Sequence, residues 1–231
     1  MQLKLTWRYG IAFMAFVFVF GQLHEIAHLV KVYTICGIPG KQLDFNLWIV
    51  DNSCVSNPGI WMATLFGPIF SYLAMGLGFF LLLTSNKNFW PIGFVLVLGN
   101  LPFARIFTAA MGGGDETTVL KSLLLPGWSL LLIKIAGFLT VFILSFPPLY
   151  MCFKRLQGKS KFFTITGFCV LPLIIMLLYE FKLLGLALKT GFLADRHYLG
   201  IPDLILLHTF LMATLVLLNI KTLFGSKLIL L

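Results

Sequence analysis

The amino-acid sequence predicts an all-α, polytopic membrane protein. Of its 231 residues, 59% are apolar and only 11% are charged. Its mean hydropathy is +0.98, which excludes a soluble domain of ordinary composition. Several apolar runs can cross a hydrocarbon core about 30 Å thick, which takes about 20 helical residues. We therefore predict one integral membrane domain over residues 1–231, with about six transmembrane helices and a short β-hairpin or strand between the first two.

The expected spans follow the apolar runs in chain order. They cover Tyr9–Tyr33, Ile60–Leu83, Phe89–Met111, Ser129–Tyr150, Phe162–Tyr179 and Leu204–Phe224. Two glycines and a proline in Cys36–Gly40 end the first span. Lys41–Ile49 then alternates apolar and polar residues, which is the period of a strand. A structured connecting loop is the alternative for this stretch.

Two of the spans contain residues that break helices. Gly67-Pro68 interrupts the second span, and a proline there frees backbone groups that neighbours or a cavity must satisfy, although a simple kink is the alternative. In the third span, Asn100 places an amide at membrane depth and is soon followed by a proline. Three glycines, Gly112–Gly114, then precede two carboxylates and allow the backbone to turn sharply toward a site.

The formal net charge of +9 indicates a partner surface of anionic lipid headgroups. We find no signature of nucleic-acid binding. The connection Lys154–Lys161 is strongly basic, so we expect it on the cytoplasmic side together with both termini. The N-terminal apolar run imitates a signal peptide, but no small-residue cleavage site follows it, and we expect a retained first span.

The four cysteines do not form a Cys-x-x-Cys pair, which disfavours a cysteine metal site. Cys36 and Cys54 flank one loop and can form a disulfide if that loop faces an oxidising compartment. Two free thiols are the alternative.

The first span carries the pattern His-Glu-x-x-His, as His24, Glu25 and His28. Residues four apart share one face of a helix, so both imidazoles can bind one metal ion. Glu25 lies beside them, where it can take a proton from a metal-activated water. A solvated helix can carry such a pattern by chance. Here the surroundings are apolar, and inserting an acidic side chain there costs about 3 kcal/mol, which argues for a partner.

A catalytic metal of this type keeps three protein ligands, and the motif supplies two. Asp115 is our choice for the third, because it follows the glycine run beside a broken span. Glu116 and His208 remain open alternatives. Asp115 and Glu116 can instead cap the next helix, and His208 can instead bond a backbone carbonyl.

These residues together resemble the site-2 protease family of intramembrane zinc metalloproteases. The His24-Glu25-x-x-His28 motif lies in an early span, Gly67-Pro68-x-x-Ser71 resembles the family's Gly-Pro-x-x-Asn, and the Asn100 segment followed by Asp115 resembles its Asn/Pro-rich segment with an aspartate ligand. Ser71 replaces the usual Asn, and Asp115 lies farther from Asn100 than is common.

The resemblance implies a metalloprotease core over residues 1–125 and additional transmembrane helices over 126–231. It implies Zn²⁺ held by His24, His28 and Asp115, with Glu25 as the catalytic acid and base. Asn100, Gly67, Pro68 and Ser71 would then bind substrate. The implied activity is hydrolysis of transmembrane proteins, as in regulated intramembrane proteolysis, by a multi-pass protein of a prokaryotic cell membrane.

Other function classes share parts of this pattern. A membrane di-iron hydroxylase needs many more than four histidines. The prenyl-protein type of membrane protease also uses His-Glu-x-x-His, but Gly-Pro-x-x-Ser does not belong to its pattern. The broken spans also fit a transporter, or a scaffold that binds membrane helices without activity. Measuring bound zinc separates these alternatives.

Overall fold

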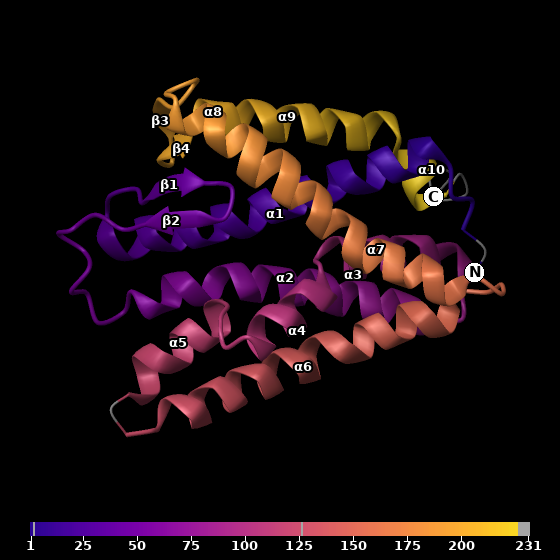
Figure 1. Ribbon diagram of the computed structural model, residues 1–231, viewed down its shortest axis with the longest axis horizontal. Helices are drawn as coiled ribbons and strands as arrows, with labels where there is room; N and C mark the ends of the chain where they lie inside the picture. Colours follow the sequence, from indigo (N-terminus) through magenta and orange to yellow (C-terminus); the bar gives the residue numbers. More distant parts are fainter. Residues whose placement is uncertain (2, 126, 226–231) are drawn as a thin grey trace.

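Helices make up most of the computed structural model, which describes residues 1, 3–125 and 127–225 (Figure 1). The parts of the predicted domain on residues 2, 126 and 226–231 lie outside the described residues. The α-helices are α1 (Trp7–Cys36), α2 (Trp61–Leu83), α3 (Trp90–Gly99), α4 (Pro102–Ala110), α5 (Asp115–Leu124), α6 (Leu130–Arg155), α7 (Lys161–Ile175), α8 (Gly185–Lys189), α9 (Asp203–Leu218) and α10 (Ile220–Phe224). A 3₁₀ turn, η1 (Lys87–Phe89), precedes α3, and a π-helical segment, η2 (Met176–Leu184), joins α7 to α8.

Five helical stretches among the described residues are long and apolar enough to cross a membrane. They are Trp7–Cys36, Trp61–Leu83, Lys87–Ala110, Leu130–Arg155 and Lys161–Lys189. The predicted all-α polytopic class is thus confirmed, and the chain is consistent with a multi-pass membrane protein. The predicted sixth span, Leu204–Phe224, forms α9 and α10 instead of one continuous helix. The chain leaves helical geometry at Asn219, whose side-chain amide donates to the Leu215 carbonyl (2.9 Å).

The predicted hairpin between the first two spans is present. Strands β1 (Lys41–Asp44) and β2 (Leu47–Ile49) pair antiparallel. Gln42 on β1 is fully buried and exchanges two side-chain hydrogen bonds with Gln22 on α1, of 2.9 and 3.1 Å. This paired amide contact fixes the hairpin against the first helix.

A second hairpin, which the sequence does not predict, packs beside the first (Figure 1). It consists of β3 (Arg196–Tyr198) and β4 (Ile201–Pro202), too short to show an alternating pattern. The backbone N–H of Gln42 donates to the Gly200 carbonyl (2.9 Å), and Arg196 Nε donates to the backbone carbonyl of Gln42 (3.1 Å). The two hairpins therefore share one end of the helical bundle.

Cys36 and Cys54 form a disulfide, with their Cα atoms 5.8 Å apart. The bond joins the end of α1 to the loop that precedes α2. It lies at the hairpin end of the molecule, whereas Figure 1 places the N-terminus and α10 at the opposite end. Of the two alternatives for these cysteines, the structure supports the disulfide.

The breaks predicted near the site are also present. The third span divides at Asn100 into α3 and α4, and Leu101 there adopts a left-handed conformation (φ 52°). Gly112 (φ 76°) and Gly114 (φ 89°) turn the chain back before α5. Such positive φ angles favour glycine, because a Cβ atom would clash with the backbone. Pro68, by contrast, stays inside a continuous α2.

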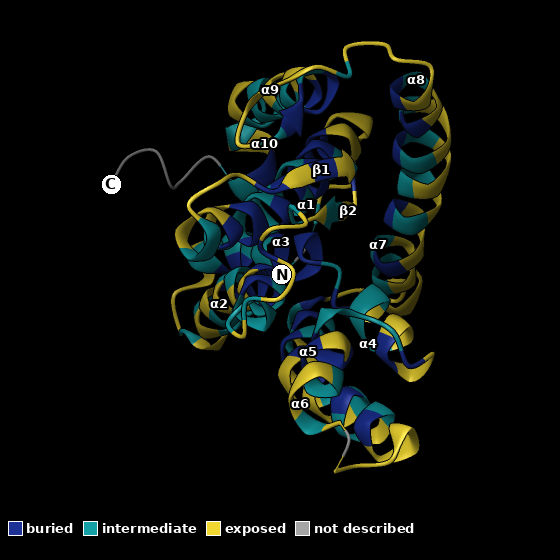
Figure 2. Ribbon diagram, turned by 90° about the vertical axis from the view of Figure 1, so that its left-hand side faces the viewer, coloured by how far each residue is buried: buried dark blue, intermediate teal, exposed yellow. Residues whose placement is uncertain are grey.

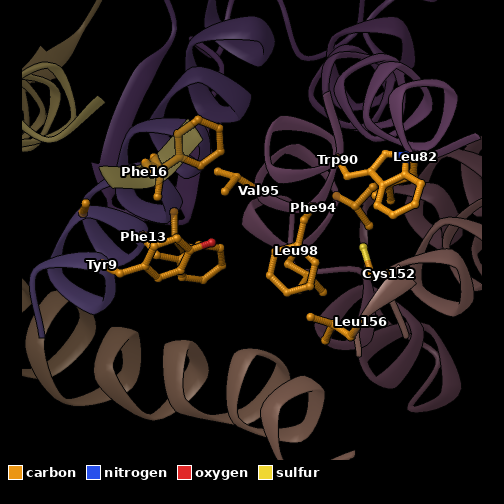
Figure 3. Packing of buried hydrophobic residues seen from close by; sticks show 14 of the residues in the cluster. Tyr9, Phe13, Phe16, Leu82, Trp90, Phe94, Val95, Leu98, Cys152 and Leu156 are labelled. Carbon is orange, nitrogen blue, oxygen red and sulfur yellow. The ribbon is translucent and has the colours of Figure 1, made fainter. Parts of the chain in front are cut away.

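The main hydrophobic core lies at the end of the bundle where the chain begins (Figure 3). Phe13 of α1 and Phe94 of α3 are almost fully buried there, and the Phe168 ring of α7 packs edge-on against both. Large apolar side chains remain exposed on the outer faces of α6 and α7 (Figure 2). Exposed apolar faces of this extent are expected on helices that contact lipid.

Candidate metal centre

The His-Glu-x-x-His motif lies on α1, closer to its Cys36 end than to Trp7. The side chain of His28 is 1% exposed and that of His24 is 12% exposed. Their Nε2 atoms point at each other across 3.0 Å. The helical spacing of four residues therefore places two imidazole nitrogens at one point, as the sequence predicts.

Asp115 reaches the same point from the start of α5. Its Oδ2 atom lies 3.2 Å from His24 Nε2 and 3.4 Å from His28 Nε2. A metal ion that binds four ligands tetrahedrally at about 2.0–2.1 Å separates them by about 3.3 Å. The three atoms thus have the mutual spacing that a common metal ion requires.

The hydrogen bonds behind the two imidazoles determine which nitrogen of each ring is free. His28 Nδ1 donates to the Ala63 carbonyl (2.8 Å), because a carbonyl can only accept. His24 Nδ1 lies 3.0 Å from Ser71 Oγ, which can accept its proton. Both Nε2 atoms then carry lone pairs that face each other and the Asp115 carboxylate. Three acceptor atoms this close together repel one another unless a proton or a metal ion lies between them.

Gly67 on α2 leaves the space into which these ligands converge. A Cβ atom at this position would lie 2.7 Å from His24 Nε2 and would overlap His28 Nε2. Glycine costs helical stability, so its presence beside the two nitrogens indicates that the space itself is needed. The residues present therefore fit a bound metal ion.

Glu25 and the two histidines form a group that could hold a metal ion, with ligand atoms within 4.8 Å of one another. Asp115 lies closer than this to both imidazoles, and we infer that Asp115 and not Glu25 completes the ligand set. Glu25 is 4% exposed, and its Oε2 atom has no hydrogen-bond partner among the described residues. It lines a cavity of about 700 Å³ that also contains both histidines and Asp115. The carboxylate is thus available to a water molecule or substrate in that cavity.

Arg105 on α4 connects the elements around the site. Its Nη2 donates to Ser71 Oγ (2.7 Å), its Nη1 to Glu116 Oε1 (3.3 Å) and its Nε to the Asn100 carbonyl (3.3 Å). Arg105 Nη2 also lies 3.0 Å from His24 Nδ1. Because guanidinium can only donate, the tautomer with its proton on Nδ1, which metal binding through Nε2 requires, bonds Ser71 instead. Glu116 additionally accepts from Tyr72 OH (2.6 Å). Fixing Glu116 also fixes the adjacent Asp115.

The other predicted site residues lie around this centre. Asn100 and Ser71 line the cavity, and Pro68 is buried within α2. Glu116 faces Tyr72 and Arg105 instead of the imidazoles. It lies in the first turn of α5 but does not cap the helix, because Gly114 is the N-cap residue and no side chain bonds there. The His208 ring packs against three aromatic rings rather than bonding a backbone carbonyl: those of Phe18, Phe45 and Tyr179. The predicted substrate-binding roles of Gly67, Pro68, Ser71 and Asn100 stay predictions.

Sequence reasoning missed Arg105 and Tyr72. A charged side chain within a predicted span was the available signal for Arg105, because such residues are rare in membranes unless they serve a site. Tyr72 carried no signal, since tyrosine is ordinary in an apolar helix.

No protein-family model, curated protein or solved structure matches this chain. The family resemblance therefore depends on the motif residues alone and stays a prediction.

Replacing Arg105 by lysine should lower metal affinity and any hydrolytic rate by about 10–100-fold, the range typical of residues that orient metal ligands. Lysine keeps the charge but cannot contact Ser71, Glu116 and the Asn100 carbonyl together. Competition with a metal-binding dye measures the affinity. Arg8→Lys, at an exposed position, is the matched control; equal affinities in the two variants would contradict the positioning role.

Proposed function

We propose that this protein is a zinc-dependent intramembrane protease that hydrolyses peptide bonds of membrane-spanning proteins. One observation carries the proposal: the Nε2 atoms of two imidazoles and one carboxylate oxygen lie within 3.4 Å of one another. The helix that carries the two imidazoles is long and apolar enough to span a membrane. Two histidines with one carboxylate form a ligand set typical of catalytic zinc sites. A bound zinc ion would supply Lewis acidity and a water molecule made acidic enough to attack at neutral pH.

The side chains around the centre support peptide hydrolysis. Glu25 Oε2, unpartnered in the cavity among the described residues, would accept the proton of the attacking water and deliver it to the leaving amine. Ser71 and Ala63 orient the two imidazoles through their Nδ1 atoms. Arg105 and Tyr72 hold the start of α5 in place through Glu116. All three ligands are thereby fixed before substrate binds, which lowers the cost of reaching the reactive geometry.

The substrate would bind in an extended form, because a helix hides its peptide bonds in its own hydrogen bonds. Among the described residues, β2 pairs only with β1. A second cavity of about 470 Å³ lies along β2 toward α2 and is lined by Trp48, Ile49 and Thr64, among others. An unwound substrate segment could add to β2 there, as strands commonly do at open sheet edges. Trp48 and Thr64 also line the cavity at the metal centre, so the two spaces adjoin.

The test is a joint measurement of bound zinc and cleavage in purified, reconstituted protein. We expect about one zinc per chain and cleavage of a single-span peptide, both lost in His24→Ala. His197→Ala is the matched control, because the side chain of His197 is 65% exposed and lies outside the cavity. Absence of zinc, or cleavage that survives in His24→Ala, would reject the proposal.

From the same arrangement we infer an orientation in the membrane. Basic residues gather at the end that carries the N-terminus: Lys4, Arg8, Lys87, Lys154, Arg155, Lys159, Lys161 and Lys221. None of the eight acidic residues lies at that end. Excess positive charge marks the cytoplasmic side, and a disulfide marks an oxidising compartment. The hairpins, the Cys36–Cys54 disulfide and the nearby metal centre then face away from the cytoplasm.

A thiol-labelling experiment checks this orientation. In intact cells treated with an impermeant reductant, we expect an impermeant maleimide to modify Cys36, which is partly exposed and is freed when its disulfide with Cys54 is reduced. The buried Cys152 and Cys169 should stay unmodified. A Lys159→Cys variant should react only after permeabilisation, because Lys159 lies in the basic connection. Labelling of Lys159→Cys in intact cells would reverse the assignment.

A further inference from the structure

The cavity at the metal centre has a second polar wall, which the proposed mechanism does not use. It extends past Glu25 to Glu180 on η2 and His208 on α9. Both residues belong to the C-terminal half of the chain, for which the sequence suggested no role except that of His208 as an alternative third ligand. Glu180 is 4% exposed and His208 is 6% exposed.

Glu180 is a buried carboxylate whose side chain has no partner within the described part of the chain. No hydrogen bond or ion pair between side chains of the described residues involves it, and the four ion pairs found there join other residues. An isolated carboxylate inside a membrane helix is costly, and such residues usually meet a cation or a proton. Since Glu180 lines the cavity, whatever meets it can enter from there.

A second carboxylate lies on the same face of η2. The Gly185 N–H donates to the Glu180 carbonyl, so these residues are one π-helical turn apart. A Cβ atom at Gly185 would lie 3.5 Å from both carboxylate oxygens of Asp44. Asp44, at the end of β1, therefore adds negative charge along the face that carries Glu180. Two neighbouring carboxylates repel each other when both are ionised, so a cation or a proton between them is stabilising.

His208 provides an independent observation. Its Nε2 atom is buried and has no hydrogen-bond partner among the described residues. A buried polar atom without a partner is costly unless a ligand satisfies it. The neutral ring can accept a hydrogen bond from a ligand N–H.

Apart from Glu180 and His208, the residues on this side of the cavity are apolar. Leu173, Met176 and Phe181 line the cavity on the same side as Glu180. An acidic end beyond an apolar wall matches a side chain with a long aliphatic stem and a cationic head. Lysine and arginine have this form, and they flank membrane spans.

We propose that Glu180 and His208, with the negative charge of Asp44 behind them, form a subsite for the ammonium or guanidinium group of a basic residue in the bound membrane-protein segment. The inference rests on the proposed function, because it places the segment at the metal centre. It gives the substrate class: spans that carry lysine or arginine near the bond that is cut.

The test uses fluorescently labelled peptides that contain one membrane span. Each peptide carries lysine, norleucine or glutamate at a single position, and this position is moved along the span from one peptide set to the next. Binding is measured by fluorescence anisotropy on the Glu25→Gln background, so that no peptide is consumed. We expect lysine to bind about tenfold more tightly than norleucine at one position, as a charge-assisted hydrogen bond would give. Glu180→Gln should remove this preference, and Asp195→Asn, which removes a charge outside the cavity, should keep it.

Charge reversal protects the test against a folding defect. Glu180→Lys should prefer the glutamate peptide at the same position, which a merely misfolded variant would not do.

Equal binding of lysine and norleucine peptides by the unmodified subsite would overturn the inference while leaving cleavage, and hence the proposed protease, intact. A lysine preference without any cleavage of these peptides by protein that retains Glu25 would instead reject the protease and keep the subsite. If Glu180→Gln slows cleavage of all peptides equally and shifts its pH profile, Glu180 carries protons, and the inference is wrong.

Discussion

Glu25→Gln is expected to slow peptide hydrolysis by about 10²–10⁴-fold, the usual contribution of a general base. Glutamine keeps the size and polarity of the side chain but cannot accept the proton from the attacking water. Glu25 Oε2 is buried and unpartnered, so no other contact among the described residues depends on its charge. Hydrolysis of a quenched fluorescent peptide under single-turnover conditions measures the loss.

The same variant decides whether Glu25 is a base or a ligand. Because Asp115 Oδ2 lies within 3.4 Å of both imidazole nitrogens, Glu25→Gln should keep metal affinity within a few-fold of the original protein, whereas Asp115→Ala should lose most of it. Full retention of metal in Asp115→Ala together with its loss in Glu25→Gln would exchange the two roles. Unchanged hydrolysis in Glu25→Gln would remove the mechanism.

The sequence alone predicted the features that local physical chemistry determines. Apolar runs near 20 residues fix where helices can cross a membrane, so the first four spans were found with errors of a few residues at their ends. The spacing of His24 and His28 fixes their common face through helical geometry alone. The alternation in Lys41–Ile49 correctly indicated a hairpin.

Features that depend on distant parts of the chain were harder to predict. Asp115 approaches the histidines because Gly112 and Gly114 reverse the chain and because Arg105 fixes the neighbouring Glu116. The sequence could nominate Asp115, but the choice against Glu116 follows from Tyr72 and Arg105, whose contacts join separate helices.

The C-terminal half gave the least information. The predicted span Phe162–Tyr179 ends where charged residues begin, but the helix continues past them through η2, with π geometry, to Lys189. The final span divides at Asn219, an amide whose effect on a helix depends on its local partner. Neither outcome follows from apolar content alone.

Gly67→Ala is expected to weaken metal binding by at least about 100-fold. This loss exceeds the usual effect of replacing a residue that hydrogen-bonds to a metal ligand, because the new methyl group enters the space of the metal ion itself. A Cβ atom would lie 2.7 Å from His24 Nε2 and would overlap His28 Nε2. The imidazoles cannot easily withdraw, since Ser71 and Ala63 hold their Nδ1 atoms. Hydrolysis should fall with the metal affinity.

Gly76→Ala provides the matched control for this variant, because it adds the same methyl group to the same helix. A Cβ atom at Gly76 would have open space within 4 Å, so this variant should bind metal normally. Alanine stabilises a helix by about 1 kcal/mol relative to glycine, which offsets part of the roughly 1–3 kcal/mol that overpacking costs at Gly67, so both variants should still unfold cooperatively on heating. Competition with a metal-binding dye, read beside the unfolding midpoint, separates loss of the site from loss of the fold. If Gly67→Ala binds metal as tightly as Gly76→Ala, the ligands do not converge in the space beside Gly67, and the proposed centre is wrong.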